Sequence, residues 1–108
     1  MAEPIERRRA ERFPVNSSTT CVFLAPVGED FGPVKIQNIS TDGIGLLVTR
    51  RVEPGVLLAV TLSNPARNFT KTVLVRVVHA TAQHGSAYLV GGTLNVPLTY
   101  EELSTLVL

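Results

Sequence analysis

The residues best suited to binding chemistry are arginines near the beginning of the chain. Four of the ten basic residues lie between positions 7 and 12, and they are Arg7, Arg8, Arg9 and Arg12. Arginine makes bidentate hydrogen bonds with phosphates and guanine edges, whereas lysine acts as a point charge. A cluster of this size is too small to coat a nucleic acid, and it suits a compact anion.

A second polar motif follows about 30 residues later, where Asn38, Ser40 and Gly43 occupy positions one, three and six of a short segment. In a strand, Asn38 and Ser40 project to the same side, so we expect them to present one polar surface. Gly43 permits either a positive φ or a close approach of another group to the backbone. Each motif alone occurs by chance, but the two together in a short β domain indicate a binding site.

The chain lacks the residue sets typical of catalysis, and we expect no catalytic residue, metal ion or cofactor. His79 and His84 have no cysteine or acidic companion at metal-ligand spacing, and we interpret His79 as a structural or partly exposed aromatic residue. Ser40 has no histidine at a spacing typical of a triad, although a distant partner stays possible. Gly43-Ile44-Gly45 lacks the third glycine of a dinucleotide fingerprint.

Length and composition predict one folded domain. The chain has 108 residues, of which 44% are hydrophobic and 18% are charged. No apolar run approaches the ~20 residues that cross a bilayer, and the first residues do not form a secretory signal, so we expect a soluble protein. The lone Cys21 cannot form an internal disulfide, which favours the cytoplasm, and we expect it to be buried as a small hydrophobe.

The periodicity predicts an all-β domain over residues 19–108, preceded by a flexible arm over residues 1–18. Short runs rich in Val, Ile, Leu and Thr are separated by turn residues. The expected strands are Thr19–Pro26, Val34–Ile39, Ile44–Thr49, Val56–Leu62, Phe69–Thr81 and Ala87–Val96, with a loop at 63–68.

A short helix is predicted at the end of the chain. Thr99 and Glu102 have the spacing of a capping box, and Leu98 and Leu103 stand at the positions of a hydrophobic staple. A helix of fewer than about ten residues is marginal alone, so it must dock on the barrel.

Taken together, these motifs resemble those of the PilZ domain family, bacterial receptors for cyclic di-GMP. Arg8 and Arg12 match the family's Arg-x-x-x-Arg motif, and Asn38, Ser40 and Gly43 match its Asp/Asn-x-Ser-x-x-Gly motif. The chain departs from the family at His79, where an aromatic residue, often Trp, is common, and at Leu94, which replaces Phe. We expect these two departures to affect packing more than ligand binding.

The resemblance implies a six-stranded antiparallel β-barrel with a flexible N-terminal arm and a short C-terminal helix. It also implies a cyclic di-GMP site, with Arg8 and Arg12 gripping guanine and phosphate and with Asn38, Ser40 and Gly43 forming the floor. Closure of the arm would order residues 5–15. In this family, an arginine immediately before the first motif is associated with the binding of two stacked cyclic di-GMP molecules. Arg7 has this position, so the resemblance implies two ligands per chain.

Because no output domain is attached, we expect the signal to pass to a separate, unidentified protein, with self-association of the domain as the second route. One alternative is a PilZ-like interaction adaptor that works without ligand. Another is a barrel for single-stranded nucleic acid, but such barrels use aromatic stacking platforms, and the chain has no Trp, four Phe and two Tyr. We therefore expect neither nucleic acid nor membrane as a partner.

Overall fold

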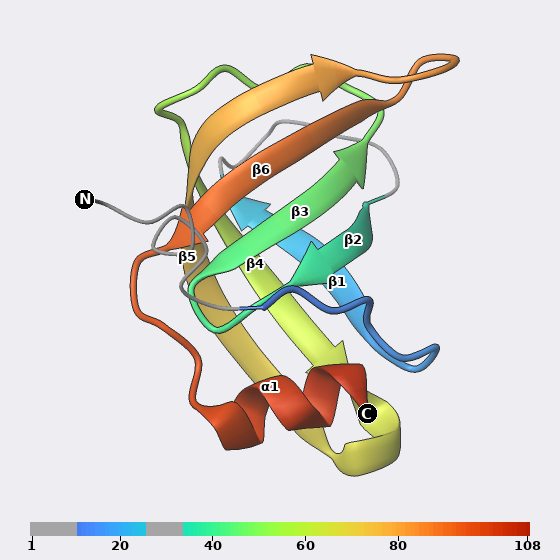
Figure 1. The fold of residues 1–108 in the computed structure, drawn as a ribbon, viewed down its shortest axis with the longest axis vertical. Coiled ribbons are helices and arrows are strands. Elements are labelled where there is room, and N and C mark those ends of the chain that lie inside the picture. The colour runs from blue at the N-terminus through green and yellow to red at the C-terminus, as the bar shows by residue number, and fades with distance from the viewer. Residues whose placement is uncertain (1–10, 26–33) are drawn as a thin grey trace, which may run out of the picture.

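The computed structural model describes residues 11–25 and 34–108, which form one curled antiparallel sheet and one helix. The strands are β1 (Thr20–Ala25), β2 (Lys35–Ile39), β3 (Gly43–Val48), β4 (Leu57–Asn64), β5 (Phe69–Ala82) and β6 (Tyr88–Leu94). Their order in the sheet is β1-β4-β5-β6-β3-β2, and each neighbouring pair is antiparallel. Figure 1 shows the long strands β4 and β5 crossing the molecule, with the helix α1 (Tyr100–Val107) at one end.

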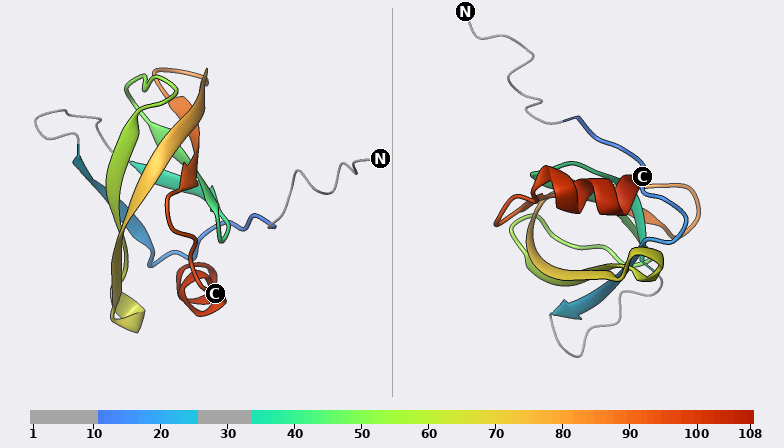
Figure 2. Two further views of the ribbon diagram at one scale, coloured as in Figure 1. Left: turned by 90° about the vertical axis from the view of Figure 1, so that its left-hand side faces the viewer. Right: turned by 90° about the horizontal axis from the view of Figure 1, so that it is seen from below.

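The predicted six-stranded antiparallel architecture is confirmed, in the form of a curled half-barrel. The sheet bends around its own core, and α1 lies across one end of the curl (Figure 2). β1 and β2 are the two edges of this sheet and are not hydrogen-bonded neighbours.

The strand boundaries agree closely with those predicted from the sequence, with one difference after β4. The segment 63–68 was expected to be a loop, but Ser63 and Asn64 continue β4, and Pro65–Arg67 form the 3-10 turn η2. The Asn64 side chain explains this, because its Oδ1 accepts a hydrogen bond from the Ala66 amide at 3.1 Å and its Nδ2 donates to the Thr105 carbonyl at 2.7 Å. Asn64 therefore begins the turn and ties β4 to α1.

The core is made by the alternating inner faces of the strands. On β5, Val73, Val75 and Val77 are buried while Leu74 and Arg76 are exposed. Cys21 belongs to this core, as expected, and burial raises the pKa of its thiol to about 12.

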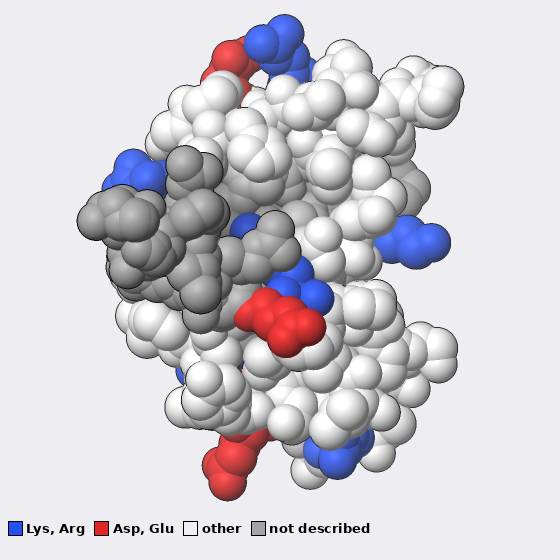
Figure 3. Space-filling model, viewed as in Figure 1, with Lys and Arg blue, Asp and Glu red and all other residues white. Residues whose placement is uncertain are grey.

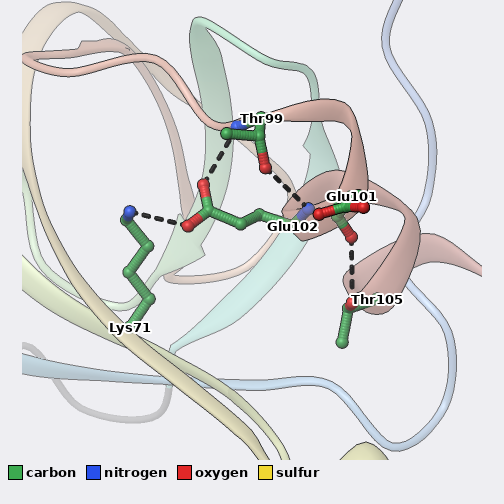
Figure 4. Close-up of polar contacts among 5 residues, drawn as sticks. All are labelled: Lys71, Thr99, Glu101, Glu102 and Thr105. Atoms are coloured by element: carbon green, nitrogen blue, oxygen red, sulfur yellow. Dashed lines mark hydrogen bonds and ion pairs between the residues drawn. The ribbon is translucent and has the colours of Figure 1, made fainter.

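The predicted capping box is confirmed, and a lysine on β5 strengthens it (Figure 4). The Thr99 hydroxyl accepts from the Glu102 amide at 3.1 Å, and the Glu102 carboxylate accepts from the Thr99 amide at 2.9 Å. The other carboxylate oxygen of Glu102 lies 2.8 Å from Lys71 Nζ. With Leu103 and Leu106 buried beneath it, the helix is docked as expected.

The predicted N-terminal arm lies partly outside the described residues, which begin at position 11. Within its described part, Phe13 exchanges backbone hydrogen bonds with Ile39 at 2.9 and 2.8 Å, and the Asn16 amide donates to the Leu106 carbonyl at 3.0 Å. Residues 11–18 are thus fastened to β2 and α1, and the flexibility of the preceding residues stays a prediction.

Candidate ligand-binding site

The two predicted binding motifs meet at Arg12 and Asn38. Arg12 Nη1 donates a hydrogen bond to Asn38 Oδ1 at 2.8 Å, although the two residues are 26 positions apart. The adjacent Phe13–Ile39 bridge holds the arm against the end of β2 and so fixes the backbone beneath Arg12. The guanidinium remains exposed, which leaves donors free for a ligand.

Gly43 is required for the close approach of Arg12. A β-carbon on Gly43 would lie 2.8 Å from Arg12 Nη2 and 3.3 Å from the Gly92 carbonyl oxygen. In the described ranges, the glycines with positive φ are Gly55 and Gly85. Of the two roles that the sequence left open for Gly43, the structure therefore supports close approach.

Gly45 makes room for the Asn38 side chain in the same way, and it lies outside the two motifs predicted from the sequence. Asn38 and Gly45 are direct partners across β2 and β3, and a β-carbon on Gly45 would lie 2.9 Å from Asn38 Oδ1. The sequence signal for this role is the spacing of Gly43 and Gly45. The two residues lie on the same face of β3, so this face has no side chain at two successive positions.

Ser40 does not share a polar surface with Asn38, contrary to expectation. Ser40 is 1% exposed, its hydroxyl accepts from the Gly43 amide at 3.0 Å, and it donates to Asp42 Oδ1 at 3.1 Å. The physical reason is that β2 ends at Ile39, so the two-residue strand period no longer applies at Ser40. In this structure Ser40 closes the turn that positions Gly43.

The electrostatic surroundings leave Arg12 available to an anion. The face drawn in Figure 3 is mostly uncharged; its basic groups are separated from one another, and a few acidic groups lie among them, one directly beside a basic group. Among the described residues, no acidic side chain forms an ion pair with Arg12; the ion pairs are Arg51–Glu53 and Lys71–Glu102. Arg7 and Arg8 lie outside the described residues, so their part in the site stays a prediction.

Two further observations concern the described part of the chain. In residues 11–25 and 34–108, no group of three or more His, Cys, Asp or Glu side chains is placed to hold a metal ion. No helix in the same ranges is long and apolar enough to cross a membrane. The described part of the site is an exposed guanidinium beside an amide, next to Gly43 and Gly45 of β3.

Comparison with protein families gives a match over nearly the whole chain. A family model described as PilZ domain matches residues 6–107 of the 108-residue chain, a range that includes both motifs. No curated protein matches the chain.

Proposed function

Because the chain belongs to the PilZ domain family, we propose that it is a cytoplasmic receptor that binds cyclic di-GMP at the Arg12–Asn38 site and passes the signal to a separate protein. The family consists of binding and adaptor domains, and the proposed role is recognition without catalysis.

The observation that carries this proposal is the 2.8 Å hydrogen bond between Arg12 and Asn38 above Gly43. Cyclic di-GMP is a dianion with two guanine bases. A guanidinium can donate two hydrogen bonds to guanine O6 and N7, or pair with a phosphate, and Asn38 Nδ2 adds a neutral donor beside it. Because Arg12 is already held by Asn38, little of its side-chain freedom remains to be lost on binding.

Arg7 and Arg8 complete the proposed site. Arg8 would pair with a second phosphate or guanine edge, and Arg7 would supply the additional cation that two stacked ligands require, since they bring four phosphates together. We therefore propose two ligands per chain. Ser40 contributes by holding the Gly43 turn, because direct contact with the ligand would require its hydroxyl to leave Asp42.

Ordering of the arm is the proposed output. Fixing a mobile backbone costs about 1–2 kcal/mol per residue, so only several charge-assisted bonds can offset the ordering of five or more residues. Phe13 is already bridged to Ile39, so the ordering would concern the residues that precede it. A partner protein would then bind the new surface that the ordered arm forms.

Calorimetric titration with cyclic di-GMP tests the proposal. We expect wild type to bind two ligands, Arg12→Ala and Arg8→Ala to lose binding with nearly unchanged Tm of the free domain, and Arg7→Leu to bind fewer ligands. Arg51→Ala is the matched control, because Arg51 is exposed and pairs with Glu53. Absence of binding to wild type would overturn the proposal in favour of a ligand-independent adaptor.

A further inference from the structure

The segment made of α1 and its C-cap residue carries the two most exposed large apolar side chains among the described residues. Tyr100 is 81% exposed and Leu108 is 82% exposed. The Leu108 amide donates to the Ser104 carbonyl at 3.0 Å, so the helical spacing continues to Leu108. Tyr100, Ser104 and Leu108 follow one another at intervals of four residues and therefore form one row along the helix, which we call the α1 stripe.

A hollow lies beside the α1 stripe, between the helix and the described part of the arm. Its volume is about 440 Å³, and it is lined by Phe13 and Pro14 of the arm, by Leu103 and Val107 of the helix, and by the stripe itself. None of these side chains is charged. The stripe and the hollow thus form one continuous apolar surface, and such surfaces mark interaction sites.

Opposite charges stand near the two ends of the stripe. Glu101 is exposed in the first turn of α1. Arg67 of η2 is exposed, and its Nη1 donates to the Ser104 carbonyl at 3.4 Å. Because helical carbonyls point toward the C-terminal end, this contact places Arg67 beside the second half of the helix. At the lower edge of Figure 3, where α1 lies in Figure 1, uncharged surface separates an acidic group from a basic group.

This arrangement is complementary to itself. If two α1 helices pack antiparallel about a two-fold axis through Ser104, Tyr100 of one copy lies opposite Leu108 of the other, about 6 Å along the helix from the axis. The small Ser104 at the centre lets the two helices approach closely. Glu101 of each copy then lies beside Arg67 of the other copy. The same patch serves on both sides, as a closed two-fold interface requires.

We propose that two copies of the chain associate through the α1 stripe as an antiparallel helix pair. The charges single out a second copy as the occupant, because a stripe with an acid at one end and a base at the other is matched by its own reverse. An eight-residue helix is only about 12 Å long, so the contact is smaller than the roughly 800 Å² per partner of a standard interface, and the dimer should dissociate on dilution. The inference goes beyond the proposed function and requires no ligand.

Sedimentation equilibrium of the full chain without ligand tests the association. From micromolar to millimolar concentration, the mean mass of wild type should rise from 11.7 kDa toward twice that value. Ser104→Lys should weaken association at least about tenfold, because it brings two like charges together on the axis. The matched control is Leu57→Lys, an exposed apolar position at the far end of β4, which should associate as wild type does. Thermal denaturation of each variant checks that the fold is kept.

A charge exchange tests the antiparallel arrangement. Glu101→Lys and Arg67→Glu should each weaken association by several fold, because each variant sets like charges against one another, and combining the two should restore it. Wild type that stays monomeric at millimolar concentration, or a dimer that persists in Ser104→Lys, would overturn the inference. A combined variant no better than the single ones would overturn the antiparallel arrangement. Titration with cyclic di-GMP decides the proposed function separately, since none of the substituted residues belongs to the proposed ligand site.

Discussion

Gly45 and Asn38 face each other across β2 and β3 so closely that a β-carbon on Gly45 would lie 2.9 Å from Asn38 Oδ1. The same oxygen accepts the hydrogen bond from Arg12 at 2.8 Å. A glycine outside both recognised motifs therefore makes room for the Asn38 side chain, which is hydrogen-bonded to Arg12 of the first motif.

Gly45→Ala should weaken ligand binding while leaving the fold intact. The added methyl group displaces the end of a flexible side chain, so Asn38 moves and Arg12 loses its partner. A hydrogen bond to a charged group contributes about 1.5–3 kcal/mol, which corresponds to at least roughly tenfold in affinity. Titration with cyclic di-GMP measures the loss, and thermal denaturation should show little change in Tm.

A double-mutant cycle tests whether Gly45 acts through Asn38. If it does, adding Gly45→Ala to Asn38→Ala should cause little further loss, because the displaced group is already absent. Additive losses would show that Gly45 has another role.

Gly92→Ala should have the opposite effect, destabilising the fold whether or not ligand is present. Gly92 points into the core, where a β-carbon would lie 2.5 Å from Val75 Cγ1 and 2.7 Å from the backbone oxygen of Arg76. Backbone cannot move aside cheaply, and overpacking of this kind costs about 1–3 kcal/mol. Denaturant unfolding should show a lower midpoint than for wild type and Gly45→Ala, and an equal midpoint would contradict the packing described for β6.

The regular part of the fold was readable from the sequence because it depends on local patterns. Alternating Val73, Val75 and Val77 predicted the inner face of β5, and Thr99 with Glu102 predicted the first turn of α1. In both cases the signal and the structure involve residues close together in the chain.

The details of the candidate site were less readable because they depend on pairing between distant strands. A bulge exists only relative to a partner strand, so the register shifts beside Asn38 and His79 leave no trace in the alternation. The burial of Ser40 likewise depends on where β2 ends. The position of the His79 ring depends on Gly91 of β6, because a side chain there would occupy the space of the ring.

Thr99→Ala should destabilise the domain through the loss of the helix cap. The Thr99 hydroxyl satisfies the Glu102 amide at 3.1 Å, and replacing such a cap by alanine costs about 1 kcal/mol. For a domain of this size, that corresponds to a fall in Tm of about 4–8 °C. The matched control is Thr70→Ala, an exposed threonine on β5, which should change Tm much less. Equal effects of the two substitutions would exclude a capping role.

The interaction of Glu102 with Lys71 should make stability depend on pH in the acid range. The hydrogen bond from Lys71, followed by that from the Thr99 amide, lowers the pKa of Glu102 from its ordinary value of 4.5. Because the folded-state pKa lies below the unfolded one, the contribution to stability is fully present above pH 4.5 and is lost as the pH falls through the folded-state pKa.

Unfolding of wild type, Glu102→Gln and Lys71→Met as a function of pH tests this linkage. At neutral pH, wild type should be the most stable of the three, since only it has the 2.8 Å ion pair. Below pH 4.5 the advantage over Glu102→Gln should shrink, because protonation gives Glu102 the neutral character of glutamine. Lys71→Met should show a weaker dependence on pH than wild type, since the main cause of the lowered pKa has been removed. A constant difference between wild type and Glu102→Gln down to the acid limit would mean that the carboxylate on α1 does not stabilise its contact with β5 by charge.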